Sequence, residues 1–237
     1  NPILTDAQLR FEMSKCEYCE EKPCREACPA HCSPADFIRA AMVGETSDIA
    51  RAAADIMTAN PFGGVCGLVC PDRHCQAACV YKKFNSAVEI PSVQATLVAK
   101  AKALGVMPTM PAVTPSGKKV AVVGAGPAGL AAAAMLARHG HAVTVFERDE
   151  ALGGSCRLIP EHRLPRDVLD SDIDFLLSLG DITVRLGQTV ADPAALLGQG
   201  FDGVVAASGL TQPITLGVDG EEMALRGLEY LRHPEKH

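Results

Sequence analysis

Val120-Ala-Val-Val-Gly124-Ala-Gly126-Pro-Ala-Gly129 decides the fold of the C-terminal part of this chain. Its first four residues are a continuous apolar run, which predicts a buried strand, and a glycine-rich turn then opens an Ala-rich helix. The glycines allow a tight turn and the close approach of a pyrophosphate, while the helix N-terminus supplies free N–H groups. We therefore expect this loop to bind a dinucleotide through Gly124, Gly126, Pro127, Ala128 and Gly129.

The pattern on both sides of the loop alternates between strands and helices. The expected elements after the strand at 120–123 are a helix at 127–138, a strand at 142–147, a helix at 167–179, and strands at 182–186 and 202–206. Strands that alternate with crossover helices form a parallel sheet. The predicted fold class is therefore α/β, with a Rossmann-like parallel sheet.

Glu147 ends the second of these strands. An acidic side chain at this position accepts hydrogen bonds from the ribose hydroxyls of a bound nucleotide. FAD and NAD(P) share the chemistry of the loop, so these residues leave the choice of cofactor open.

Three acidic residues follow on the helix expected at 167–179, namely Asp170, Asp172 and Asp174. We expect them to lie on a solvated helix face.

Ten cysteines are present, and nine of them lie between Cys16 and Cys79. The two runs are Cys16-x2-Cys19-x4-Cys24-x3-Cys28-Pro29 and Cys66-x3-Cys70-Pro71-x3-Cys75-x3-Cys79. Iron–sulfur clusters need several converging thiolates, and a Cys-Pro is common where the last thiolate of a run serves the other of two clusters. We favour iron–sulfur over four-thiolate zinc sites and over a disulfide framework. Cys32 and Cys156 are expected to be ordinary buried residues.

The composition separates the chain into zones. Residues 1–108 are predicted to be a helical domain around the cysteines, with helices near 37–43, 49–57 and 91–103. A stretch rich in proline and glycine follows, and we interpret 109–117 as a linker. Residues 118–237 would form the Rossmann-like domain.

Composition also excludes several classes of protein. The 237 residues have a net charge of −6 and are 48% hydrophobic, which excludes bulk disorder and gives no reason to expect nucleic acid as a partner. No apolar run approaches the roughly 20 residues that span a bilayer, and no secretory signal is visible. We expect a cytoplasmic protein without a membrane span.

Together these motifs resemble the small (beta) subunit of NADPH-dependent glutamate synthase and the matching N-terminal region of dihydropyrimidine dehydrogenase. The resemblance covers nearly the whole chain. It rests on both cysteine runs, the glycine loop, Asn60-Pro-Phe-Gly-Gly-Val-Cys66-Gly-Leu-Val-Cys70-Pro71, Val143-Thr-Val-Phe-Glu147, Leu152-Gly-Gly154 and Ile159-Pro-Glu-His-Arg-Leu-Pro165. It implies an N-terminal α-helical iron–sulfur domain followed by an FAD-binding Rossmann-like domain.

The resemblance also implies two [4Fe–4S] clusters with interleaved ligands. One cluster would be held by Cys16, Cys19, Cys24 and Cys79. The other would use Cys28, Cys70, Cys75 and a non-cysteine ligand, and Gln94 matches the position of that ligand. Cys66 would then bind no iron, although spacing alone would include it.

The same resemblance implies an FAD site. Gly124, Gly126 and Gly129 would lie at the pyrophosphate and Glu147 at the ribose. The remaining residues expected around FAD are Arg148, Gly153, Gly154, Arg163 and Gly209. The family's turn reads Ala-Thr-Gly where this chain has Ala207-Ser208-Gly209, a mild departure.

A larger departure concerns NAD(P)H. In the family a nicotinamide-binding domain with its own glycine loop follows this turn, whereas these 237 residues contain neither that loop nor the segment that closes the flavin site. Either the chain is truncated or this subunit has lost its nicotinamide domain, and in both cases we expect NAD(P)H to bind only through the missing domain.

The expected function is electron transfer within an NAD(P)H-linked oxidoreductase complex. The subunit would pass electrons between FAD, two [4Fe–4S] clusters and a larger catalytic partner subunit, and no catalytic residue is assigned to this chain. The alternatives are a flavin and iron–sulfur subunit of an aldehyde, 2-oxoacid or dihydropyrimidine oxidoreductase, or a non-redox iron–sulfur adaptor.

Overall fold

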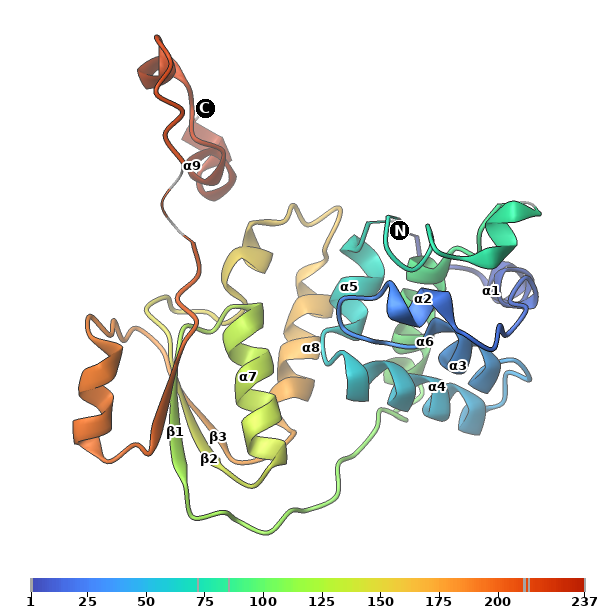
Figure 1. Ribbon diagram of the computed structural model, residues 1–237, viewed down its shortest axis with the longest axis horizontal. Coiled ribbons are helices and arrows are strands. Elements are labelled where there is room, and N and C mark those ends of the chain that lie inside the picture. The colour runs from blue at the N-terminus through green and yellow to red at the C-terminus, as the bar shows by residue number, and fades with distance from the viewer. Residues whose placement is uncertain (1, 72, 85, 211, 213, 237) are drawn as a thin grey trace. The chain divides into compact units, whose positions relative to one another are not determined.

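The computed structural model describes residues 2–71, 73–84, 86–210, 212 and 214–236. The chain divides into two compact units (Figure 1). The helical unit consists of residues 1–111 and 163–176, and the sheet unit consists of residues 112–162 and 177–237. Within the described residues, none of the helices is both long enough and apolar enough to cross a membrane.

The helical unit is built from short helices around α6. Its elements are α1 (Asp6–Ser14), α2 (Pro23–Glu26), α3 (Pro34–Ala40), α4 (Thr46–Ala59), α5 (Gly63–Val69), the 3-10 helix η1 (Val80–Lys83), α6 (Ile90–Ala103) and α8 (Arg166–Leu177). Helices α1, α3, α4 and α5 all contact α6. The core lies between these helices, where Phe37, Ile56, Met57 and Leu97 are fully buried.

Local signals explain where these helices begin. Thr5 and Gln8 form a capping box at the start of α1, with both reciprocal hydrogen bonds present. Proline occupies the first turn of α3 and of α6, where its missing N–H has no cost. The helix expected at 37–43 therefore starts earlier, at Pro34.

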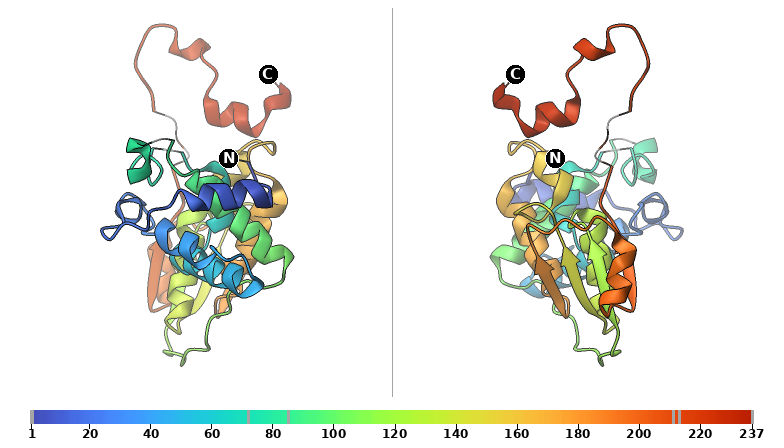
Figure 2. Two further views of the ribbon diagram at one scale, coloured as in Figure 1. Left: turned by 90° about the vertical axis from the view of Figure 1, so that its right-hand side faces the viewer. Right: turned by 90° about the vertical axis from the view of Figure 1, so that its left-hand side faces the viewer.

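The sheet unit contains a four-stranded parallel sheet in the order β3-β2-β1-β4. Its strands are β1 (Lys119–Val123), β2 (Ala142–Phe146), β3 (Ile182–Arg185) and β4 (Gly203–Ala206). Helix α7 (Pro127–Arg138) covers one face, and the 3-10 helix η3 (Pro193–Gln199) covers the other (Figure 1). The right-hand view of Figure 2 looks onto the face of the sheet and shows the strands next to one another. The remaining elements are η2 (Gly154–Leu158), η4 (Glu221–Met223), α9 (Gly227–Arg232) and η5 (Pro234–Lys236).

The strand order reverses at β1. Strands β2 and β3 lie on one side of β1, and β4 lies on the other. Ligands of open α/β sheets bind at such a switch point, beyond the carboxyl ends of the strands. The predicted α/β class with a parallel Rossmann-like sheet is confirmed, and the predicted helix at 127–138 has the same bounds as α7.

The crossover helix α8 departs from the expected organisation. The sequence pattern assigns it to the nucleotide-binding domain, whereas residues 163–176 are compact with the helical unit. The expectation that Asp172 is solvated is wrong, because this side chain has 0% exposure. Its carboxylate is held by Lys102 and by the backbone N–H of Val65, both of them in the helical unit. Asp174 is exposed, as expected.

Candidate functional site

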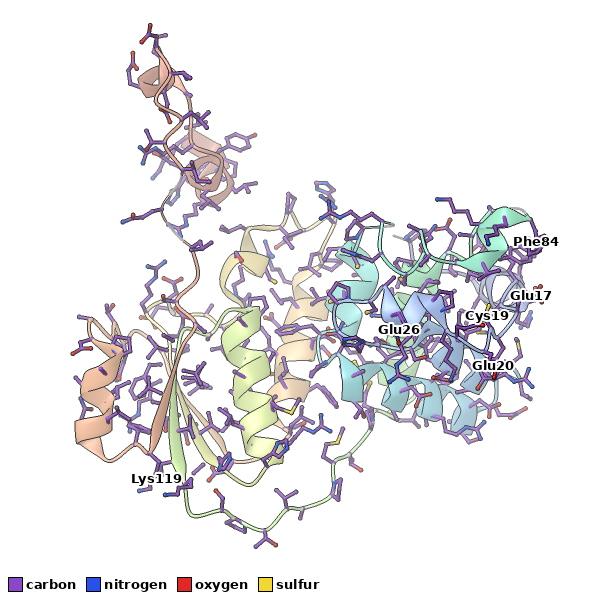
Figure 3. The ribbon with its side chains drawn as sticks, in the orientation of Figure 1. Glu17, Cys19, Glu20, Glu26, Phe84 and Lys119 are labelled. Atoms are coloured by element: carbon purple, nitrogen blue, oxygen red, sulfur yellow. The ribbon has the colours of Figure 1, made fainter. Side chains whose placement is uncertain are left out.

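Four cysteines from the two runs line one pocket of the helical unit: Cys16, Cys19, Cys24 and Cys79. Cys79 belongs to the second run, yet it acts electrostatically on the thiols of Cys16 and Cys24, so the three lie close in space. Figure 3 marks Cys19 with Glu17 and Glu20 in the loop before α2. The pocket gathers the four residues that the resemblance implies for the first cluster.

The first cysteine run has an unusual backbone. Among the described residues, the non-glycine positions with positive φ are Tyr18, Lys22 and His31, at 49°, 44° and 49°, and all three lie in or directly beside this run. Such conformations cost about 1–3 kcal/mol each and concentrate at functional sites. In the same run the N–H of Tyr18 donates to the Cys16 sulfur. Hydrogen bonds of this kind tune the reduction potential of a bound iron–sulfur cluster.

A second group of cysteines contains Cys28, Cys70 and Cys75. Cys28 belongs to the first run but acts electrostatically on both of the others. Burial raises the pKa of Cys75 to about 12 and also raises the pKa of Cys70. Burial therefore favours the neutral thiol at these positions, and a bound metal would have to supply the charge that stabilises a thiolate. The same effect of burial raises the pKa of Cys16 and Cys24.

Gln94 is buried on α6, and its amide lies beside the start of α5. The Nε2 atom donates a 2.8 Å hydrogen bond to the carbonyl oxygen of Gly63. This bond uses the amide nitrogen and keeps the amide oxygen as the atom that can ligate iron. Helix α5 ends with Cys70 as its C-cap residue, so Gln94 contacts the helix that delivers a predicted ligand.

The other cysteines occupy different environments. Cys32 is buried as expected, with 2% exposure, whereas Cys156 is only half-buried. Cys66 lies within α5 and acts electrostatically on Cys32. Among the residues that the structure describes, no three His, Cys, Asp or Glu side chains are close enough to bind a single metal ion. The ligand sets of both clusters stay predictions.

The glycine loop joins β1 to α7 at the switch point of the sheet. A Cβ atom at Gly124 would collide with the carbonyl of Ala207, which follows β4, and one at Gly129 would collide with the carbonyl of Gly124. A Cβ atom at Gly126 would meet no atom within 4 Å. Gly124 and Gly129 thus let the backbone close on itself, and Gly126 leaves open space where a pyrophosphate can approach.

Glu147 follows β2 and holds the loop from the side. Its Oε2 atom accepts a 2.6 Å hydrogen bond from the N–H of Ala125, and its Oε1 atom accepts a 3.0 Å bond from the N–H of Asp149. Each carboxylate oxygen has a second lone pair. The side chain can therefore keep these bonds and still accept from a ribose hydroxyl.

A cavity of about 490 Å³ lies at the carboxyl ends of the strands. This volume is within the range of about 300–1,000 Å³ that is typical of ligand pockets. The predicted residues that line it are Gly124, Gly126, Pro127, Ala128, Glu147, Arg148, Gly154 and Gly209. The cavity is lined both by glycine backbone, which a pyrophosphate can approach, and by an acidic side chain, which can accept from a ribose hydroxyl. It therefore suits the ADP portion of a dinucleotide.

Three predicted residues do not line the cavity. Gly129 packs beneath the loop, as described above. Gly153 has a φ of 113° and donates a 2.8 Å hydrogen bond to the carbonyl of Ala125, so it supports the loop from behind. Arg163 belongs to the helical unit. A contact of Arg163 with a flavin stays a prediction.

Part of the cavity wall was not predicted from the sequence. Gln188, Thr189 and Val190 line it, in the segment that follows β3. The sequence could have indicated these residues, because they follow a predicted strand and the carboxyl ends of parallel strands lie at the same edge of the sheet. Ser155 and Leu158 of η2 also line the cavity, and no motif marks them.

Comparison with known proteins supports the interpretation of both domains. Residues 1–106 match the family described as dihydropyrimidine dehydrogenase domain II, 4Fe-4S cluster. Residues 122–179 match the family described as NAD(P)-binding Rossmann-like domain. The iron–sulfur interpretation of the cysteine runs and the nucleotide-binding interpretation of the loop are thus confirmed at family level.

Individual relatives extend over most of the chain. The chain is 34% identical over 82% of its length to the NAD-dependent dihydropyrimidine dehydrogenase subunit PreT of Escherichia coli and 31% identical over 92% to the small chain of NADPH glutamate synthase from the same organism. It is 36% identical over 86% to the beta subunit of the NADPH-Fe(3+) oxidoreductase of Geobacter sulfurreducens. It spans 47%, 46% and 30% of these relatives.

Proposed function

We propose that this chain, which carries the iron–sulfur domain of the dihydropyrimidine dehydrogenase and glutamate synthase small-chain family, is an electron-transfer subunit of an NAD(P)H-linked oxidoreductase. It would pass electrons between FAD, two [4Fe–4S] clusters and a larger catalytic subunit. The observation that carries the proposal is the meeting of Cys79 with Cys16, Cys19 and Cys24 in one pocket. Cysteines from two distant runs line the same pocket, which supports the interleaved ligand set that we propose.

The chain's own residues supply the ligands. Cys16, Cys19, Cys24 and Cys79 would hold the first cluster. Cys28, Cys70, Cys75 and the amide oxygen of Gln94 would hold the second. Among the seven cysteines, Cys75 is buried and the others are partly buried. The N–H donors to Cys16 and Cys24 would stabilise the thiolate form.

The glycine loop would hold FAD in the cavity at the carboxyl ends of β1 and β4. A bound flavin accepts two electrons as a hydride and releases them singly, which suits one-electron clusters. The N–H groups at the start of α7 would bind the pyrophosphate, and Glu147 would accept from the ribose. Gly126, which has no side chain, would leave space for the pyrophosphate to approach the loop. The described residues contain a single such loop, so NAD(P)H would require a site outside it.

The partner is proposed from the relatives. PreT and the NADPH-Fe(3+) oxidoreductase beta chain are named as subunits. A subunit that holds flavin and clusters, with no catalytic constellation assigned, would hand its electrons to substrate chemistry elsewhere. Because the chain spans less than half of the relatives cited, the substrate and the partner belong to this proposal.

The test is the anaerobic visible spectrum of the purified chain, with the FAD content measured after the protein is denatured. We expect flavin bands on a broad cluster shoulder, and about one FAD per chain, because one loop holds one pyrophosphate. A cluster shoulder without any flavin, even after incubation with FAD, would contradict electron transfer through this chain and favour an iron–sulfur adaptor.

A further inference from the structure

Asp172 of α8 is the most deeply buried acidic side chain of the described residues, with 0% exposure. Its Oδ2 atom accepts a 2.8 Å hydrogen bond from the N–H of Val65, which lies 107 residues earlier. Its Oδ1 atom accepts a 2.7 Å bond from Nζ of Lys102. The N–H of Gly64 also donates to this carboxylate. Asp172 therefore satisfies two free N–H groups in the first turn of α5.

Helix α5 needs such support, because its own sequence stabilises it poorly. Three of its seven residues are glycine, the poorest helix former after proline. Its N-cap residue, Phe62, offers no side-chain hydrogen bond. A carboxylate at a helix N-terminus supplies both the missing acceptor and a favourable charge. Asp172 thus caps α5 from a distant helix.

The glycines of α5 are what let its neighbours approach. A Cβ atom at Gly64 would lie 2.8 Å from Oδ1 of Asp172, and one at Gly67 would lie 2.6 Å from the backbone nitrogen of Ala95. Helix α5 is therefore packed backbone-to-backbone against α6 and capped directly by α8. Its position is set by these contacts more than by its own propensity.

The same helix carries the residues proposed for the second cluster. Cys70 is the C-cap residue of α5, and its N–H donates to the carbonyl of Cys66 at 2.9 Å. Gln94 donates to the carbonyl of Gly63 at 2.8 Å. The turn at residues 63–65 is thus bound both by Asp172 and by the predicted non-cysteine ligand.

We propose that Asp172, with its charge balanced by Lys102, is a positioning residue for the second iron–sulfur cluster. It fixes the first turn of α5 and, through this turn, the placement of Cys70 and Gln94. This inference rests on the proposed function, since it presupposes that the second cluster binds there. The first cluster, held by Cys16, Cys19, Cys24 and Cys79, uses no residue of α5.

The experiment compares Asp172→Asn with Asp174→Asn in the 237-residue chain after anaerobic cluster reconstitution. Asp174 lies on the same helix and is exposed, so its variant is a matched control. The amide introduced by Asp172→Asn keeps one acceptor oxygen but presents N–H groups where the carboxylate accepts. Loss of a residue bonded directly to a metal ligand costs about 10–100-fold in metal affinity, and Asp172 acts one step further out, through the backbone of α5, so the lower end of this range applies. We therefore expect chelators to remove iron from one cluster about tenfold faster or more, with a shift of its EPR signal only.

In a folded Asp172→Asn variant, two cluster signals that stay like wild type, or that both weaken equally, would overturn the positioning role. Asp172→Asn leaves the Lys102 charge without its partner, which can prevent folding. The double variant Asp172→Asn/Lys102→Met removes both charges and is measured in parallel, with the circular dichroism of the apoprotein as the check on folding. We expect it to fold and still show the selective shift, because the amide presents N–H groups at one of the two positions where the carboxylate oxygens accept.

The outcomes separate this inference from the proposed function. A wild-type chain with two clusters and an unchanged second cluster in the folded double variant refutes only the role of Asp172. A wild-type chain that takes up no [4Fe–4S] cluster refutes the proposed function, and the positioning role falls with it.

Discussion

The N–H of Ala125 donates a 2.6 Å hydrogen bond to Oε2 of Glu147. Ala125 lies inside the glycine loop, and Glu147 follows the neighbouring strand β2, so this bond ties the loop to the sheet beside it. The acid proposed to bind ribose is therefore also part of the structure of the loop. Substitution of Glu147 therefore tests its role in ribose binding and its role in holding the loop at the same time.

Glu147→Gln should weaken FAD binding by about 10–100-fold, since a hydrogen bond to a charged group contributes about 1.5–3 kcal/mol. The amide replaces one acceptor oxygen with N–H groups that would face the backbone N–H of Ala125 or Asp149. The measurement is a titration of apoprotein with FAD, followed by flavin fluorescence. Glu150→Gln, at an exposed position, is the control and should bind FAD normally. Equal affinity of the two variants would contradict the role of Glu147.

Glu147 should also exclude nucleotides that carry a 2′-phosphate. Its carboxylate lines the cavity, and two negative charges in close contact repel each other. We expect AMP to compete with FAD for the loop and adenosine 2′,5′-bisphosphate, which differs from AMP only by its 2′-phosphate, to compete about tenfold less well or worse. A competition assay on the FAD-loaded chain measures both. Equal competition would show that Glu147 does not face the ribose.

Gly126→Ala and Gly129→Ala should fail in different ways. A Cβ atom at Gly126 meets no neighbour within 4 Å, so this variant should keep the stability of the wild-type apoprotein but lose FAD affinity. A Cβ atom at Gly129 collides with the backbone of Gly124, so that variant should also unfold at a lower temperature. Thermal unfolding of the apoproteins, together with FAD titration, separates the two effects. Normal FAD affinity in Gly126→Ala would refute the proposed approach of the pyrophosphate.

Gln94→Ala and Cys66→Ala test the ligands of the second cluster. Gln94→Ala should change one EPR signal or its midpoint potential and leave the other cluster nearly untouched. Cys66→Ala should keep both clusters, since Cys66 is expected to bind no iron. If Cys66→Ala destroys a cluster while Gln94→Ala is silent, the ligand set implied by the family resemblance is wrong.

Local patterns predicted the sheet unit well. Helix α7 has the expected bounds because a proline in its first turn and Gly140 after its end are short-range signals. The strands follow from apolar runs, and β1 pairs in parallel with both β2 and β4. Such features depend on residues that are neighbours in the chain.

Asp172 shows what local patterns could not supply. Its neighbours Asp170 and Asp174 make the helix look solvated, and nothing nearby in the chain signals a buried acceptor. Its partners lie 107 residues away at Val65 and 70 residues away at Lys102. Cys79 is similar, because its spacing alone assigns it to the second run while the fold brings it to Cys16. The burial of Asp172 and the position of Cys79 both depend on contacts between segments that are distant in the sequence.

The central claim is that this chain holds two [4Fe–4S] clusters, and the most direct test is iron and acid-labile sulfide analysis of the anaerobically purified protein. With seven cysteine ligands and Gln94 in use, the analysis should give about eight iron atoms and about eight sulfides per chain. Stoichiometric zinc with negligible sulfide would contradict the account.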